Sequence, residues 1–211
     1  MPGGCRAWKT GTMRRSRSAE AVKMVGAWPD HLLTIDEWSS LRTGDLFCEL
    51  VEGVPVVAPQ PPRHQLAVWR LAAQLEPALP APLAALARIE LVVEERFPAT
   101  VRIPDVLVVG GAAGAAHATR VRPSDVLAAV EIAAPGSRRV DRVLKYAEYE
   151  SVGIEHYWLL DTEGPVRLRA FALRDGRYEP VGEHSGQVTL DLAGHRLPLD
   201  LDALTALRSL S

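Results

Sequence analysis

The sequence predicts a single domain of the α/β or α+β class, built on a mixed β-sheet that is flanked by helices. Segments rich in Val and Ile alternate with segments of helical periodicity, and a strand-rich part ends the chain. The length of 211 residues suits one domain with a sizeable core. With 47% hydrophobic and 24% charged residues, the composition excludes disordered, collagen-like and coiled-coil proteins.

The first elements follow from local signals. Thr34 and Glu37 form a capping-box pattern that opens a short helix, which we expect to end at Gly44. Residues 47–57 predict two short strands around a turn at residues 52–53.

The later elements follow from the spacing of apolar residues and of turn signals. In chain order they are a helix over 62–79, paired strands over 88–96 and 101–109, a loop over 110–118, a buried strand over 126–133, a helix over 140–152, strands over 156–161, 166–173, 177–184 and 187–192, and a terminal helix near 201–207. Asp175-Gly176 predicts a hairpin turn between two of these strands. The apolar surface of the helix over 62–79 is expected to consist of Leu66, Trp69, Leu71, Ala73 and Leu75.

The charge is divided unevenly along the chain. Residues 1–26 hold six basic residues and one acidic residue, a net charge of +5, whereas the remainder carries −7. We therefore expect a basic, disordered leader over 1–27 and one domain over 28–211. The leader could instead contact nucleic acid through phosphates. The acidic body argues against broad DNA binding but allows a nuclease whose carboxylates are neutralised by metal ions.

The chain carries no signal for export or for a membrane. No apolar run approaches the roughly 18 residues that a membrane-spanning helix needs, and no apolar segment of a signal peptide follows the basic start. The two cysteines, Cys5 and Cys48, cannot form a disulfide framework or a zinc cluster. We expect a cytoplasmic protein that is not attached to a membrane.

Two carboxylates interrupt otherwise apolar strands. Asp105 lies in the strand over 101–109 and Glu131 in the strand over 126–133, each on an apolar face. A buried carboxylate is unfavourable unless it is protonated, paired with a cation or bound to metal. Two such groups, 26 positions apart on strands that could be neighbours, suggest a shared ion, and oxygen ligands favour Mg²⁺ or Mn²⁺. Alternatively, one carboxylate pairs with a core arginine such as Arg102 and the other lies at an exposed strand end.

Lysine usage singles out Lys145. The chain has 24 basic residues, of which three are lysines, and Lys9 and Lys23 both lie in the leader. An ammonium group is a compact charge that can orient or deprotonate water. Asp141 lies four residues before Lys145 on the same helix face and is a candidate for supporting it. Alternatively, the two residues form an ordinary surface ion pair.

Glu49 and His64 are weaker candidates. Glu49 lies in the segment CELVEG and is either a third acidic ligand or a half-exposed strand residue. His64 stands at a helix start behind two prolines, where a histidine is a capping or surface group more often than a ligand. The sequence contains no nucleophile elbow, Walker loop, dinucleotide-binding fingerprint or CxxC pair.

Pro104-Asp105, Glu131 and Lys145, taken in this order, resemble the PD-(D/E)XK nuclease superfamily. The fuller pattern resembles one branch of it, the Uma-two family of restriction-endonuclease-like proteins, over roughly residues 28–200. The matching segments are LTIDEW (33–38), CELVEGVPV (48–56), His64 at a helix start, VRIPDVLVV (101–109), VEIAAPGS (130–137) and DRVLKYAEYESVGIEHYWLLD (141–161).

The resemblance implies a restriction-endonuclease-like fold and an endonuclease that hydrolyses phosphodiester bonds of DNA with Mg²⁺ or Mn²⁺. Asp105 and Glu131 would be metal ligands, and Lys145 would be the active-site lysine. Glu49 and His64 match further positions near the site. Glu49 would complete the acidic set or hold a second ion.

Two positions depart from the expected pattern. Ala133 stands where the superfamily usually has its lysine, although in the Uma-two branch the following helix supplies it, as Lys145 does here. Ala134 replaces a small polar residue before Pro135. Two other functions stay open, namely a non-catalytic protein that binds nucleic acid or a partner, and a metal-dependent hydrolase of a small phosphodiester. The sequence is also compatible with a homodimer.

Overall fold

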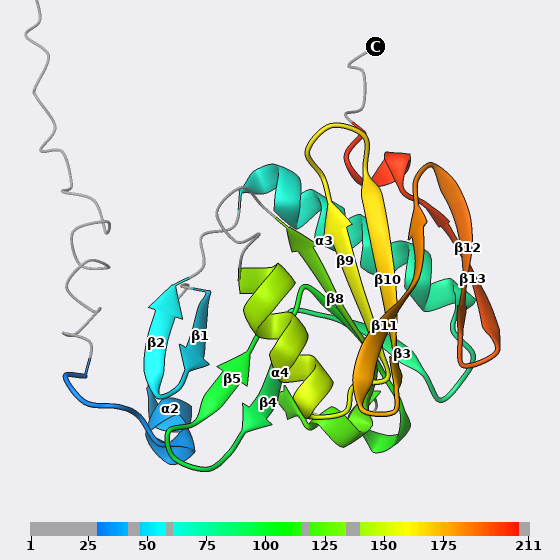
Figure 1. The fold of residues 1–211 in the computed structure, drawn as a ribbon. Coiled ribbons are helices and arrows are strands. Elements are labelled where there is room, and N and C mark those ends of the chain that lie inside the picture. Colours follow the sequence, from blue (N-terminus) through cyan, green and yellow to red (C-terminus); the bar gives the residue numbers. More distant parts are fainter. Residues whose placement is uncertain (1–28, 42–46, 58–60, 115–118, 134–139, 207–211) are drawn as a thin grey trace, which may run out of the picture.

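The computed structural model describes residues 29–41, 47–57, 61–114, 119–133 and 140–206 (Figure 1). Most of the regular secondary structure in this part of the chain is strand in mixed sheets, on which a few helices pack, so the predicted fold class is confirmed. The predicted leader over 1–27 lies outside the described residues. Among the helices that are described, none has the length and apolar character required to cross a membrane.

Within the described residues the strands form a larger sheet in the order β11-β10-β9-β8-β6-β3 and a smaller sheet in the order β2-β1-β5-β4-β7, while β12 and β13 pair as a hairpin. The smaller sheet consists of β1 (Cys48–Val51), β2 (Val54–Val57), β4 (Glu90–Glu94), β5 (Thr100–Arg102) and β7 (Arg120–Val121). The larger sheet consists of β3 (Ala84–Ala87), β6 (Val106–Val109), β8 (Val126–Ala133), β9 (His156–Asp161), β10 (Arg167–Arg174) and β11 (Arg177–His184). The hairpin consists of β12 (Gln187–Leu192) and β13 (His195–Asp200).

The central strand β8 is buried along nearly its whole length, as its apolar sequence predicts. It pairs parallel to β9 and antiparallel to β6. Helix α3 (Pro62–Leu75) covers one face of the larger sheet, and α4 (Tyr146–Ser151), which follows a π-helical segment over Val140–Lys145, covers the other (Figure 1). Two apolar cores therefore lie on opposite sides of β8.

The segment 101–109 does not form one strand, contrary to the sequence-based prediction. β5 ends at Arg102 and belongs to the smaller sheet, where it pairs with β4, whereas β6 starts at Val106 and belongs to the larger sheet. Pro104, which has no amide hydrogen to donate to a strand ladder, lies between them. The chain therefore changes sheets at Asp105.

Helix α3 differs from its prediction in extent and orientation. It ends at Leu75, and a 3₁₀ turn over Glu76–Ala78 follows it, because Pro77 cannot continue the helical hydrogen bonds. The buried face runs through His64, Ala67, Val68, Leu71 and Leu75. Trp69 and Ala73, which were expected on that face, are exposed.

The terminal regions show where local signals suffice and where they fail. The capping box of Thr34 and Glu37 is confirmed, but α2 (Ile35–Ser40) ends before Gly44, which lies outside the described residues. The hairpin turn at Asp175-Gly176 is also confirmed, since both residues have positive φ. At the other end of the chain, β13 was not predicted, and only a 3₁₀ turn over Asp202–Leu204 replaces the predicted terminal helix.

Candidate active site

Asp105 lies at the boundary between the two sheets, where the chain passes from β5 to β6. The register of β6 with β8 brings it beside Glu131. Its Oδ2 accepts a hydrogen bond from the backbone amide of Ile132 at 2.8 Å and one from His64 Nε2 at 3.1 Å. Within the described residues both hydrogen bonds of this buried carboxylate go to Oδ2, which leaves Oδ1 for another partner.

His64, on the first turn of α3, holds this carboxylate in place. Its Nε2 lies 2.8 Å from the carbonyl oxygen of Ile132 and 3.1 Å from Asp105 Oδ2. Since both of these atoms are acceptors, Nε2 must carry the proton. Nδ1 is buried and, among the described residues, has no hydrogen-bond partner. His64 is therefore a buried residue that contacts Asp105, rather than a surface or capping group.

Lys145 is buried between two carboxylates. Its Nζ lies 3.1 Å from both carboxylate oxygens of Glu131 and 3.0 Å from Glu49 Oε1. The lysine is 6% exposed and Glu131 is 2% exposed. Lys145 is therefore an interior residue that joins the larger sheet, through Glu131, to the smaller sheet, through Glu49. The alternative of an ordinary surface ion pair with Asp141 expects an exposed lysine, and the burial of Lys145 contradicts that.

Arg102 completes the surroundings of Glu49. The pairing of Leu50 with Val101 sets Glu49 opposite Arg102, whose Nη1 donates to Glu49 Oε2 at 3.0 Å. Arg102 also forms a bidentate ion pair with Glu148, with hydrogen bonds of 2.7 Å and 2.6 Å. The core arginine thus pairs with Glu49 and Glu148, and not with Asp105 or Glu131 as the sequence-based alternative had it.

The ionised state of Glu49 is favoured despite its burial. Burial by itself would raise the pKa of this carboxyl group, but the charges of Lys145 and Arg102 and the hydrogen bond from the Ile103 amide outweigh that effect. The pKa of Glu49 is consequently below its ordinary value. Burial opposes the charge of Arg102 too, yet its hydrogen bonds to Glu148 and the charge of Glu49 raise its pKa.

Tyr149 supports Glu131 from α4. The phenol is fully buried and donates a hydrogen bond of 2.8 Å to Glu131 Oε1. Burial and the nearby charges of Glu131 and Glu49 raise its pKa well above the ordinary value, so that it acts as a neutral donor. Sequence reasoning missed Tyr149 and Glu148. The available signal was the spacing, since Glu148 lies three residues and Tyr149 four residues after Lys145, which puts all three on one helix face.

The cluster, in which Glu148 is half-buried and the other members are buried, carries more negative than positive charge. Its described side chains are four carboxylates and two cations, namely Glu49, Asp105, Glu131, Glu148, Arg102 and Lys145. The excess of two negative charges matches one divalent cation, and oxygen donors suit hard ions such as Mg²⁺ or Mn²⁺. Among the described residues no group of three His, Cys, Asp or Glu side chains is arranged so that it could hold a metal ion, and the Lys145 ammonium stands between Glu49 and Glu131. The oxygen donors are of the kind that a hard ion prefers, but binding of an ion by both Glu49 and Glu131 requires Lys145 to give up one of these contacts.

The structure therefore places the predicted site residues in two adjoining groups. Lys145 joins Glu131 and Glu49 directly, and Asp105 and His64 meet at the backbone of Ile132, the residue after Glu131. The side chain of Asp141, the predicted support for Lys145, lies outside the described residues. The catalytic and metal-binding roles stay predictions.

Comparisons with known proteins bear on this arrangement. The family model of Uma2, described as "Putative restriction endonuclease", matches residues 32–202. The chain belongs to the Uma2 family. This confirms the resemblance found in the sequence, and the matched region contains the whole cluster around Lys145. A search of curated proteins gives no match.

A solved structure shares the fold. It is the crystal structure of "a putative nuclease belonging to DUF820 from Anabaena variabilis ATCC 29413", with a TM-score of 0.63 and 16% sequence identity. The similarity covers 82% of this chain and 99% of that protein. At this level of identity the comparison shows a common fold, which agrees with the nuclease family assigned to the chain.

Proposed function

We propose that this Uma2-family protein is a metal-dependent endonuclease that hydrolyses phosphodiester bonds in DNA. The observation that carries the proposal is the buried Glu131–Lys145–Glu49 contact beside Asp105. Such a cluster has little value for stability, because desolvation of the charges offsets most of their attraction. An excess of negative charge with one embedded lysine is instead what a cation-assisted reaction on a phosphate requires.

Asp105 and Glu131 would hold Mg²⁺ or Mn²⁺, and Glu49 would be the third acidic ligand. A divalent ion at this position supplies Lewis-acid polarisation of the phosphate and lowers the pKa of a bound water. The chain keeps the carboxylates oriented through hydrogen bonds, from His64 to Asp105 and from Tyr149 to Glu131. Positioning residues of this kind commonly accompany metal ligands in proteins.

Lys145 would act on the reacting groups. Its ammonium is a compact charge with three donors, which can stabilise negative charge on the phosphate and orient the attacking water. Because Glu49 and Glu131 both contact Nζ, the lysine is held beside the carboxylates before any substrate arrives. Arg102 in turn fixes Glu49 through its hydrogen bond to Oε2.

The test is incubation of the purified protein with supercoiled plasmid and Mg²⁺ or Mn²⁺, with EDTA as the control. We expect nicking or linearisation that depends on the metal. Lys145→Ala should reduce the rate roughly 10²–10⁴-fold without loss of the fold. Lys145→Arg is the matched control for charge, and it should also fail, because a guanidinium is wider and stays protonated.

Other outcomes would contradict the proposal. Cleavage by Lys145→Arg at the wild-type rate would show that the lysine has no special role. Tight DNA binding without cleavage would identify a non-catalytic nucleic-acid-binding protein. Hydrolysis of a small phosphodiester, with DNA neither bound nor cut, would identify a hydrolase of small molecules.

A further inference from the structure

We propose that Arg88, stacked on Phe47, binds a phosphate of the DNA backbone next to the cleavage site. This inference rests on the proposed function and specifies how the substrate is held. Neither residue is among those predicted from the sequence, and neither belongs to the carboxylate cluster. Both lie at its border.

Arg88 is held close to Asp105 by the fold. Arg88 lies between β3 of the larger sheet and β4 of the smaller sheet, so that the chain changes sheets at Arg88 as it does at Asp105. The two crossings are joined directly, because the Arg88 amide donates a hydrogen bond of 3.3 Å to the backbone carbonyl of Asp105. Arg88 has a φ of 60°, a left-handed conformation that is uncommon for a residue other than glycine. The fold thus holds this arginine beside a proposed metal ligand.

The guanidinium of Arg88 lies over the aromatic ring of Phe47. Arg88 Cζ lies 3.6 Å from the centroid of the Phe47 ring, which is 41% exposed. Phe47 directly precedes β1, and the antiparallel pairing of β1 with β5 runs it toward Pro104 and Asp105. In an extended chain Phe47 and Glu49 share a face. The stacked pair therefore borders the site on the side of the smaller sheet.

The hydrogen-bonding edge of the Arg88 guanidinium is available for a phosphate. Among the described residues, no carboxylate forms an ion pair or hydrogen bond with its guanidinium, whereas Arg102 pairs with Glu49 and Glu148, and Arg120 pairs with Glu90. A guanidinium that stacks on a ring keeps its N–H groups in the plane available, and this geometry suits bidentate binding of a phosphate. The charge of Asp105 favours the cation, although burial lowers the pKa of Arg88.

The negative charge of the site favours a nearby cation that can contact the DNA backbone. The carboxylate cluster repels the phosphates that flank the scissile bond, and the body of the protein is acidic overall. A cation that is fixed beside the cluster, and that no described carboxylate holds in an ion pair, offsets this repulsion where the backbone must approach. Arg88 meets that requirement.

The experiment measures binding of a fluorescent DNA duplex in Ca²⁺ by anisotropy, at several salt concentrations. Arg88→Ala should weaken binding about tenfold or more, as loss of a charge-assisted contact does. It should also reduce the slope of log K against log salt by about 0.9, the value for one phosphate contact. Arg88→Lys should keep most of the slope but bind more weakly, because lysine cannot make the planar bidentate contact.

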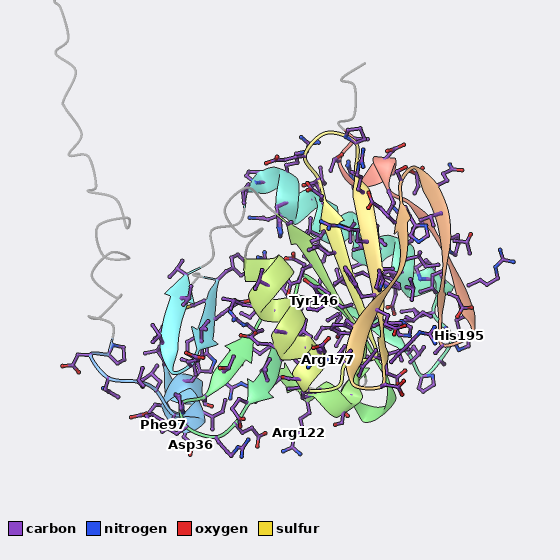
Figure 2. All side chains as sticks on the ribbon, viewed as in Figure 1. Asp36, Phe97, Arg122, Tyr146, Arg177 and His195 are labelled. Carbon is purple, nitrogen blue, oxygen red and sulfur yellow. The ribbon has the colours of Figure 1, made fainter. Side chains whose placement is uncertain are left out.

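Arg196→Ala is the matched control. Arg196 is exposed on β13, next to His195, on the far side of the molecule from β1 (Figures 1 and 2). This variant removes the same charge and should bind as the wild type does. If Arg88→Ala or Arg88→Lys matched Arg196→Ala in affinity and slope while the wild type bound and cut DNA, this inference would be overturned and the proposed function would stand. If the wild type neither bound nor cut DNA, both would fail. Thermal melting of each variant shows that the fold is intact, and if Arg88→Ala does not fold, Arg88→Lys alone decides.

Discussion

Both faces of β8 pack in apolar cores, but the buried charges of Glu131 and Lys145 lie on the α4 face. On the α3 face, Val130 and Ile132 pack in an apolar core with Leu71 of the helix. On the α4 face, Glu131 meets Lys145 and a set of hydrogen bonds. Apolar burial stabilises a fold in proportion to the area removed from water, whereas buried ion pairs contribute little net stability. The comparison indicates that apolar burial on the α3 face carries stability, whereas the charged residues that interrupt the apolar core on the α4 face contribute little to it.

The largest effect on stability is expected on the α3 face. Leu71 is fully buried, so Leu71→Ala should lower the free energy of unfolding by about 2–5 kcal/mol through lost burial and a residual cavity. Denaturant titration measures this change. The variant that remains folded should cleave DNA at nearly the wild-type rate. A stability loss below about 1 kcal/mol would contradict the assignment of stability to this face.

Tyr149→Phe should have a smaller effect on stability and a specific effect on the site. Removal of the hydroxyl takes one hydrogen bond from Glu131, with an expected loss of about 1 kcal/mol. The matched control is Tyr178→Phe, since the buried Tyr178 hydroxyl donates to the carbonyl oxygen of Ile154 at 2.8 Å. Both variants should melt at lower temperature, but Tyr149→Phe alone should reduce cleavage. Equal activity in the two variants would count against a positioning role for Tyr149.

Acid should destabilise the fold through protonation of Glu49, which lies on β1 and contacts Lys145. Because its pKa in the folded protein is lowered from the ordinary value of 4.5, the ionised group stabilises the fold at every pH above that value. This contribution is lost as the pH falls through the lowered pKa. Thermal melts between about pH 3 and pH 6 should therefore show a loss of stability in acid that is weaker in Glu49→Gln. Leu71→Ala should keep the wild-type dependence, and an unchanged dependence in Glu49→Gln would refute the assignment.

The smallest effect is expected at Trp69. This residue is on α3 but 66% exposed, so Trp69→Ala should change stability by no more than about 0.5 kcal/mol. Thermal melting compared with Leu71→Ala, two residues along the same helix, makes the test. A large loss would show that Trp69 is covered in solution.

Much of the site could be predicted from single residues whose type is unusual for their place in the sequence. Asp105 and Glu131 stand out because carboxylates are rare in buried apolar segments, and Lys145 stands out because arginine otherwise supplies the basic charge. Their neighbours could not be assigned in the same way. Arg102 had several possible acidic partners, and the pairing of β1 with β5 decided in favour of Glu49.

The sequence by itself determined the features that depend on a few consecutive residues. The capping box at Thr34 and the hairpin turn at Asp175-Gly176 are of this kind, because backbone conformation and local hydrogen bonds specify them. The buried strand over Val126–Ala133 was predicted from its continuous apolar run.

Only the tertiary structure decided how the segment 101–109 divides between two sheets, which face of α3 is buried, and that Arg88 lies on Phe47. These features depend on contacts between residues far apart in the chain. Strand pairing and packing select such contacts from many alternatives of similar local energy.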